Sequence, residues 1–308
     1  MTPAITLLGP QRRPTLDRVL GSLDVPGPIA TVTAGWQERE ADDAELDALT
    51  GGRSLNLRLH ARWMDVLHRD PEYAAAEREH RLMLDELRQL YLLRLDHALQ
   101  ALSTVEQRSD GHARVQEMAR EDALAIVRLI DERHLARVDE LHADFYARWR
   151  LEEREAVAQH REEVRRVLTE VGGLLIAGGH VGDLLRVLHV FHLGPHLPAQ
   201  VVAWSAGAMA LTSRVVLFHD RAVQGPAQTE VFDEGLEAVR DLVLLPHARR
   251  RLRTEDVGRM SVLARRFAPA TCLVLDDEVR VDLGPDGALP PQARVVSTDG
   301  RIVEGEPA

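Results

Sequence analysis

The segment of this sequence best suited to chemistry is a serine within a run of small residues. Residues 203–209 read AWSAGAM, and Ser205 follows an apolar run, residues 201–204, that is typical of a buried strand. A sharp turn from a strand into a helix exposes a serine Oγ, and small neighbours let the two elements approach closely. Free N–H groups at the start of such a helix stabilise a developing oxyanion. The segment therefore predicts a nucleophilic serine, although Ala203 stands where the G-x-S-x-G pattern has its first glycine.

A nucleophilic serine needs a base to take its proton and usually a carboxylate to orient that base. Asp220 follows the apolar run 215–218, and His247 follows the apolar run 242–245. Both runs are expected to be strands of the same sheet as the strand before Ser205, and α/β proteins form their sites at the carboxyl edge of that sheet. The chain thus offers an acid and a base after the serine, in the order Ser, Asp, His. A histidine after a strand is also often only a hydrogen-bonded surface side chain.

The elements that must position these residues alternate short apolar runs with helical patterns, which is typical of βαβ units. The runs that predict strands are residues 5–8, 29–33, 55–59, 172–180 (a strand that runs into a glycine turn), 201–204, 215–218 and 242–245. The patterns that predict helices are residues 14–23, 41–49 and 182–191. Residues beyond 271 alternate apolar and polar side chains around glycine turns, as antiparallel hairpins do. The sequence predicts an α/β fold with a mostly parallel sheet, helices on both faces and a C-terminal β-hairpin region.

A central block, residues 72–170, differs because it contains no proline and a single glycine, Gly111. Apolar side chains recur there at three- and four-residue steps, so the block is expected to be helical. A turn at residues 109–111 would fold it into a hairpin whose first helix, of about 35 residues, runs ~50 Å. We interpret residues 60–170 as a helical insertion within one domain that spans residues 1–308.

This hairpin is either an arm for packing and dimerisation or a cap over the site. Two long amphipathic helices bury their apolar stripes only partly against each other, so the remaining surface needs a partner. Two-fold homodimers are the commonest solution, and a homodimer is therefore expected.

Composition excludes several classes of protein. The chain has 308 residues, of which 45% are hydrophobic and 28% charged, so it is expected to be globular. No apolar run reaches the roughly 18 residues of a membrane span. The net charge of −11, from 38 Lys and Arg against 49 Asp and Glu, disfavours nucleic acid as a partner. The single cysteine, Cys272, rules out an internal disulfide, and no secretory pattern opens the chain, so a cytoplasmic location is expected.

Four segments together resemble one known family. The chain is similar to the serine peptidases that include aspartyl dipeptidase (peptidase E) and cyanophycinase, whose fold is shared with class I glutamine amidotransferases. The segments that carry the resemblance are residues 178–185 (GGHVGDLL), 204–209 (WSAGAM), Asp220, and 244–247 (LLPH). Asp220 follows Ser205 by 15 positions (220 − 205), as in the family. The similarity covers residues 1–59 and about 171–308 and leaves out the helical block.

The resemblance implies a flavodoxin-like fold and a serine-type hydrolysis of a peptide or isopeptide-like amide. Ser205 would attack, His247 would carry the proton and Asp220 would hold the imidazole. The amides of Gly179 and Ala206 would form the oxyanion hole. No cofactor would be needed, and the substrate would be a small peptide, with acidic residues expected only by analogy.

Three further residues are candidates for contact with the substrate. Gly178 belongs to the family's glycine turn, and His180 stands where the family usually has Asn. Arg249 lies in the basic run HARRRLR, residues 247–253, and is suited to an acidic substrate group, although such a run is also often a solvated surface.

Other readings of the chain remain open or have less support. A non-catalytic binding or regulatory protein could retain this fold and use the helical hairpin for assembly. A glutamine amidotransferase needs a cysteine nucleophile, and Cys272 is remote from Ser205 in sequence. The group His189, His192 and His196 has spacings that suggest zinc, but Gly194-Pro195 would break the helix before the last of them, so no metal is expected.

Overall fold

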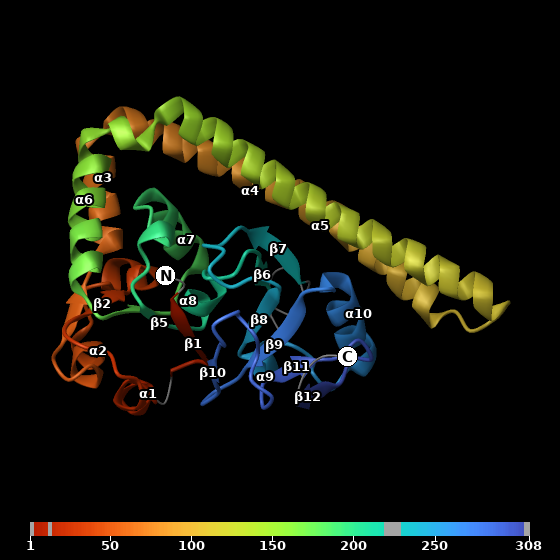
Figure 1. Cartoon of the computed structure of the whole chain (residues 1–308). Coiled ribbons are helices and arrows are strands. Elements are labelled where there is room, and N and C mark those ends of the chain that lie inside the picture. Colours follow the sequence, from red (N-terminus) through yellow and green to blue (C-terminus); the bar gives the residue numbers. More distant parts are fainter. Residues whose placement is uncertain (1–2, 12–13, 219–228, 305–308) are drawn as a thin grey trace.

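A mostly parallel six-stranded sheet forms the centre of the molecule (Figure 1). The computed structural model describes residues 3–11, 14–218 and 229–304. The strands are β1 (Ala4–Leu8), β2 (Ile29–Val32), β3 (Ser54–Asn56), β4 (Gly173–Ile176), β5 (Gln200–Trp204) and β10 (Arg280–Asp282). Their order is β10-β1-β5-β4-β2-β3, and every neighbouring pair is parallel except β1 with β10. The predicted mixed α/β class with a mostly parallel sheet is confirmed.

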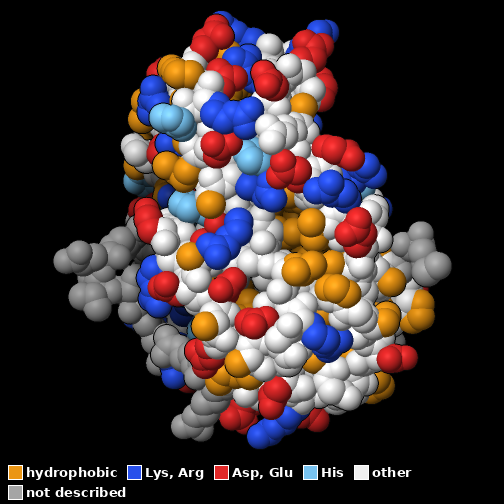
Figure 2. Space-filling model, turned by 90° about the vertical axis from the view of Figure 1, so that its left-hand side faces the viewer, with side chains coloured by type: hydrophobic (Ala, Val, Ile, Leu, Met, Phe, Trp, Pro, Cys, Tyr) orange, Lys and Arg blue, Asp and Glu red, His pale blue; other side chains and the backbone are white. Residues whose placement is uncertain are grey.

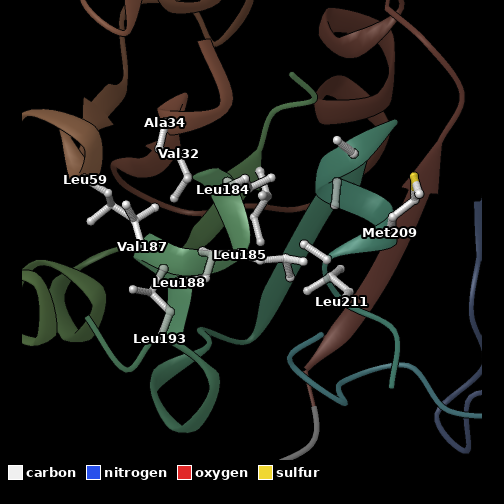
Figure 3. Packing of buried hydrophobic residues seen from close by; sticks show 14 of the residues in the cluster. Val32, Ala34, Leu59, Leu184, Leu185, Val187, Leu188, Leu193, Met209 and Leu211 are labelled. Atoms are coloured by element: carbon white, nitrogen blue, oxygen red, sulfur yellow. The ribbon is translucent and has the colours of Figure 1, made fainter. Parts of the chain in front are cut away.

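Helices cover both faces of this sheet because its strands are apolar on both sides. In β5, Val201 and Ala203 pack in one hydrophobic cluster, whereas Val202 and Trp204 pack in another. The first cluster includes side chains from α3 (Leu59–Arg69), α6 (Glu155–Glu170) and α7 (Val181–Val190); the second includes α1 (Leu16–Ser22) and α2 (Ala44–Leu49). Figure 3 shows the first cluster, with Val187 of α7 beside Leu59 of α3.

Of the strands after Ser205, β10 joins the central sheet beside β1, and the others do not. The others have their own pairing. They form a four-stranded sheet in the order β12-β11-β9-β8 and a two-stranded sheet, β6-β7. Their bounds are β6 (Val215–Leu217), β7 (Glu230–Asp233), β8 (Leu242–Pro246), β9 (Thr271–Leu275), β11 (Arg294–Val296) and β12 (Ile302–Glu304). The expectation that runs 215–218 and 242–245 belong to the central sheet is therefore wrong. Apolar runs show that strands exist but do not say which strands pair.

The C-terminal part of the chain combines parallel and antiparallel pairing. β8 and β9 are parallel and joined through α10 (Val257–Phe267), whereas β11 and β12 form the expected antiparallel hairpin. A short helix, α9 (Ala248–Arg251), directly follows β8.

The helical block forms a long hairpin, here called the arm, and one further helix. The arm consists of α4 (Pro71–Gln107) and α5 (Ala113–Trp149), each 37 residues long, with the predicted turn between them. Its apolar seam contains Tyr91, Leu95, Leu102, Leu124 and Val127. The rest of the block, α6, packs on the central sheet instead. Although both arm helices are long, none of the helices among the described residues is apolar enough to span a bilayer.

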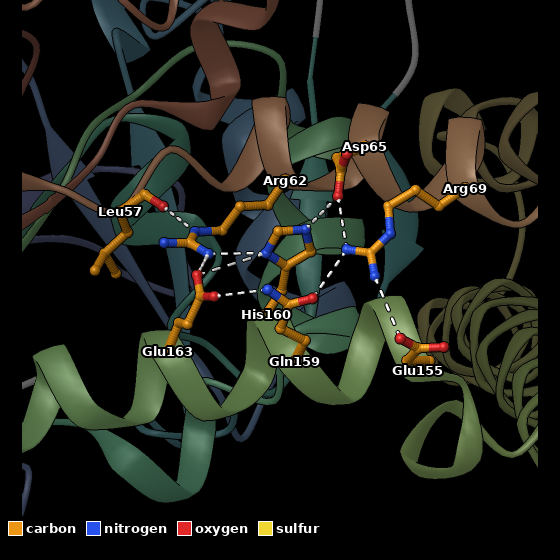
Figure 4. Close-up of polar contacts among 8 residues, drawn as sticks. All are labelled: Leu57, Arg62, Asp65, Arg69, Glu155, Gln159, His160 and Glu163. Carbon is orange, nitrogen blue, oxygen red and sulfur yellow. Dashed lines mark hydrogen bonds and ion pairs between the residues drawn. The ribbon is translucent and has the colours of Figure 1, made fainter.

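At the base of the arm, α3 and α6 lie side by side (Figure 4). His160 of α6 lies between two residues of α3, with Nε2 2.8 Å from Asp65 Oδ2 and Nδ1 2.8 Å from Arg62 Nη1. Arg62 also pairs with Glu163. The face that carries these helices shows acidic and basic side chains interspersed (Figure 2). Such pairing keeps the two helices in register at the point where the chain leaves and rejoins the sheet.

The arm is docked on the chain's own body. Tyr91 of α4 donates its hydroxyl hydrogen to Asp131 of α5 (2.8 Å) and accepts the amide of Val231 in β7 (3.0 Å). Asp131 also pairs with Arg266 of α10. Farther toward the base, Arg88 forms a 2.6 Å ion pair with Glu230 of β7. Part of the arm's surface is thus covered by β7 and α10, and the tip projects past α10 (Figure 1).

Candidate active site around Ser205

Ser205 lies on the sharp turn that the sequence predicts. It ends β5 and precedes α8 (Ala206–Met209), and its backbone has φ 54° and ψ −122°. A non-glycine residue in this region costs about 1–3 kcal/mol and persists only where its surroundings impose it. A Cβ on Gly207 would lie 2.2 Å from the carbonyl oxygen of Ile176, so only glycine lets α8 pack this closely on β4. Glycine at position 207 is therefore a steric requirement of this turn.

His247 reaches Ser205 from the second sheet. Its Nε2 lies 3.3 Å from Ser205 Oγ, within hydrogen-bonding distance. The residue follows β8 in a left-handed conformation (φ 59°, ψ 31°), and its amide donates to the carbonyl of Leu275 at the end of β9 (3.2 Å). The serine and histidine named from the sequence thus meet, although their strands belong to different sheets.

The predicted acid, Asp220, lies outside the described residues. Within them, another carboxylate stands at the same edge: Asp276 directly follows β9. Parallel pairing places Pro246 opposite Leu275, so His247 and Asp276 leave adjacent strands at the same level. Asp276 is 7% exposed. Sequence reasoning missed this residue. The available signal was its position directly after the apolar run 271–275, where a residue at the carboxyl edge of a sheet is expected.

Arg249 is tied to Asp276. Its amide donates to Asp276 Oδ1 (3.0 Å), and its guanidinium Nε lies 3.4 Å from Oδ2. The carboxylate therefore holds the first turn of α9, which begins directly after His247. The Arg249 side chain, predicted to meet the substrate, is 70% exposed and so stands at the rim of this edge.

The glycine turn, residues 177–180, packs directly against Ser205. A Cβ on Gly178 would lie 2.8 Å from Ser205 Cβ, so that position has room for glycine only. Gly179 has φ 138°, and a Cβ there would lie 2.2 Å from the carbonyl oxygen of Gly35. The same carbonyl accepts the amide of His180 (2.7 Å). Among the described residues, none accepts a hydrogen bond from the amides of Gly179 or Ala206.

His180 caps α7 and forms a pair with Asp183. Its Nδ1 lies 3.1 Å from the amide nitrogen of Asp183 and 2.9 Å from Asp183 Oδ2. One nitrogen cannot accept from the amide and donate to the carboxylate together, so the protonation state of the ring selects between the two contacts. The hydrogen bond to Asp183 raises the pKa of His180, and the same bond holds the pKa of Asp183 far below its usual range.

A cavity of about 700 Å³ lies between the arm and the α7–β7 side of the body and adjoins His180. The arm supplies Glu77, His80, Arg81, His142 and Tyr146 to its wall, and the body supplies His180, Asp183, Arg186, Phe232 and Asp233. Burial lowers the pKa of His80 to about 4, so this imidazole is neutral at neutral pH. The arm thus forms one wall of the space beside the glycine turn.

The structure also describes the histidines with zinc-like spacing and the single cysteine. No group of three His, Cys, Asp or Glu side chains suited to a metal occurs among the described residues. His189, one of the three histidines with zinc-like spacing, has Nε2 3.3 Å from the carbonyl oxygen of Glu234. Cys272 lies within β9, where burial raises the pKa of its thiol to about 12 and leaves it protonated.

Comparisons with protein families and with curated proteins found no match to this chain. The geometry around Ser205 is therefore what bears on function.

Proposed function

We propose that this protein is a serine-type hydrolase that cleaves a peptide or isopeptide-like amide through an acyl-serine intermediate. The observation that carries the proposal is the 3.3 Å contact between Ser205 Oγ and His247 Nε2, with the serine held on a strained turn. Serine and histidine in this contact, at the end of a strand, have the geometry of an activated nucleophile.

In the proposed reaction, Ser205 Oγ attacks the amide carbonyl while His247 Nε2 takes the hydroxyl proton. The C–N bond then breaks as His247 gives that proton to the leaving amine. Water attacks the resulting ester, His247 takes a proton from the water, and Ser205 regains its hydroxyl hydrogen when the acid leaves. The amides of Gly179 and Ala206 stabilise the oxyanion in both halves, and these steps use only side chains, amides and water.

Two carboxylates are candidates for the residue that orients His247. Asp220 is the acid implied by the family resemblance. Asp276 has independent support, because it leaves the strand next to that of His247 and holds the turn that follows it. A carboxylate that accepts the hydrogen of His247 Nδ1 would favour the imidazole tautomer that accepts a proton at Nε2.

The proposed substrate is a small peptide. The adjoining cavity of about 700 Å³ has the volume of a typical small-ligand site. Gly178 packs against Ser205, His180 lines the cavity, and Arg249 stands at the rim of the Ser205 edge; these are the proposed substrate contacts.

Strand order supports a flavodoxin-like core of the class I glutamine amidotransferase type. The order β3-β2-β4-β5 corresponds to 2-1-3-4 of the flavodoxin order 2-1-3-4-5, with β1 in the fifth place. Ser205 then stands at the carboxyl end of the fourth strand, at the edge where open α/β sheets bind ligands.

Labelling with a fluorophosphonate tests the proposal. The wild type should be labelled, whereas Ser205→Ala should not, and His247→Ala should react at least about 10³-fold more slowly. Ser213→Ala, a matched change at a serine beyond the turn, should be labelled as the wild type is. A folded wild-type protein that resists the reagent would favour the non-catalytic binding protein instead. If the wild type is labelled, a screen of aspartyl and β-aspartyl dipeptides would identify the bond that is cleaved.

A further inference from the structure

We infer that the arm is a working part of this site: Glu77 of α4, acting through Arg186 and Asp183, holds the glycine turn in place beside Ser205. Glu77 is thus a positioning residue for the reaction. The inference rests on the proposed function for its catalytic consequence, but its structural content stands on contacts alone.

The first step is the burial of Glu77. This carboxylate is 4% exposed, and burial raises its pKa above the usual range. Its Oε1 lies 3.3 Å from Arg186 Nε, and its Oε2 lies 3.2 Å from Arg81 Nε. A buried carboxylate without basic partners is strongly unfavourable, so Arg186 and Arg81 are what stabilise this charge. Removing the charge in turn removes one of the carboxylates that hold Arg186.

The second step joins the arm to α7. Arg186 lies one turn along α7 from Asp183, and its Nη1 donates to Asp183 Oδ1 at 2.6 Å. The same guanidinium therefore holds a carboxylate of the arm through Nε and a carboxylate of α7 through Nη1. All three side chains are largely buried, so solvent screens these contacts weakly.

The third step joins Asp183 to the backbone around Ser205. Its Oδ2 accepts from Gln37 Nε2 (2.5 Å) and lies 2.9 Å from His180 Nδ1. Gln37 has φ 59° and ψ −125°, a conformation that its surroundings must impose. It belongs to the 3₁₀ segment η1 (Ala34–Arg39), which also contains Gly35, the acceptor of the His180 amide. Asp183 thus links His180, at the end of the glycine turn, to the η1 segment that packs against the turn.

This series of contacts predicts an effect on the chemical step more than on binding. An oxyanion donor works only when it is correctly placed, and a shift of about 1 Å can cost about 100-fold in rate. Glu77 also lines the cavity, but Arg186 and Arg81 engage its carboxylate, so loss of its charge should lower kcat more than it changes KM.

Two matched variants of α4 separate this role from general stability. Glu77→Gln removes a charge that holds Arg186 of α7. Glu106→Gln, on the same helix α4 but near the tip of the arm, removes the charge that pairs with Arg265 of α10. Hydrolysis of p-nitrophenyl acetate gives kcat and KM, the fluorophosphonate gives the reactivity of Ser205, and hydrogen exchange reports on residues 178–183. For Glu77→Gln we expect kcat and labelling to fall by about 10- to 100-fold and exchange in 178–183 to accelerate. Glu106→Gln should match the wild type in all three.

Arg186→Gln keeps the inference testable if Glu77→Gln folds poorly. Because both residues act in one series, the double variant should be no slower than the slower single variant. Equal behaviour of Glu77→Gln and Glu106→Gln, or additive losses in the double variant, would overturn the inference. If the wild type itself fails to react, the proposed hydrolase is wrong, while the exchange of residues 178–183 still decides whether the arm holds the turn.

Discussion

Asp131 of the arm and Arg266 of α10 form a two-point ion pair in which both side chains are almost completely buried. Arg266 Nε lies 2.6 Å from Asp131 Oδ2, and Nη2 lies 2.6 Å from Oδ1. The two side chains are 3% and 2% exposed. Tyr91 adds its hydroxyl to the same carboxylate. Displacing the arm would leave these charges without partners, so the pair fixes the arm to the body.

Asp131→Asn should therefore destabilise the protein by about 3–5 kcal/mol, because it leaves the Arg266 charge buried without a counterion. Chemical denaturation of the purified variant measures this loss. Glu140→Gln, which removes the exposed pair with Arg137, should cost no more than about 0.5 kcal/mol. Equal losses of free energy of unfolding in the two variants would show that the buried pair stabilises the protein no more than the exposed pair does.

His134 should make the arm sensitive to acid. Its ring stacks on Tyr91 (centroids 3.9 Å apart), and burial lowers its pKa to about 4. Neither ring nitrogen has a hydrogen-bond partner among the residues that the structure describes. The unfolded chain, with an ordinary pKa of about 6.5, binds the proton more tightly, so stability is full at neutral pH and falls as the pH drops through 6.5 toward 4.

Replacing that imidazole tests the origin of the acid sensitivity. His134→Phe keeps the stacking and removes the titration, so between neutral pH and about pH 5 it should lose about 2 kcal/mol less free energy of unfolding than the wild type does. The free energies come from denaturant titrations at the two pH values. Parallel losses in both proteins would assign the sensitivity to other groups, among which His80 has a similarly lowered pKa.

Asp276→Ala should slow fluorophosphonate labelling of Ser205 by about 100-fold or more, because the turn that carries His247 loses its anchor. Asp277→Ala provides the control, since that neighbouring carboxylate is half-exposed and lies 3.8 Å from Arg250. Asp220→Asn should also slow labelling if Asp220 orients the imidazole. A normal rate in Asp276→Ala combined with a large loss in Asp220→Asn would assign the acid to Asp220 alone.

The arm should also mediate a homodimer. Most of the large apolar side chains that are exposed among the described residues lie on it: Leu82, Met83, Leu90, Leu93, Val115, Met118, Ile126 and Leu129. Light scattering should give a dimer for the wild type. Leu90→Glu and Ile126→Glu should each weaken it by about tenfold or more in Kd, and Leu55→Glu on β3 should not. A monomeric wild type would leave this surface unexplained by self-association.

Local patterns in the sequence predict individual elements well. The strands before Ser205 and the hairpin of α4 and α5 follow from apolar periodicity, and the turn near Gly111 was expected because no other glycine or proline interrupts the block. The elbow at Ser205 was expected because small residues surround it. Each of these features depends on residues close together in the chain.

Features that depend on distant residues could not be predicted in this way. The placement of β8 in a second sheet depends on its pairing with β9, and the role of Asp276 depends on the register of that pair. Gln37 gives no local sign of its positive φ, since glycine is the usual residue there. The ion pair of Asp131 with Arg266 joins residues 135 positions apart, and no local pattern in either segment predicts that the two side chains are in contact.

The close packing of α3 against α6 means that the chain leaves the sheet and returns to it at one place. The arm is in effect a lengthened connection between β3 and β4, so its gain or loss alters neither strand order nor register. Beyond Glu106, which pairs with Arg265 of α10, the hairpin can change length by whole turns, about 5.4 Å each, and keep the contacts of the arm with the body. Near its base it cannot, because Glu77 pairs there with Arg186 of α7. In an architecture of this kind the outer end of the arm can vary in length, while the inner end stays bound to the body near Ser205.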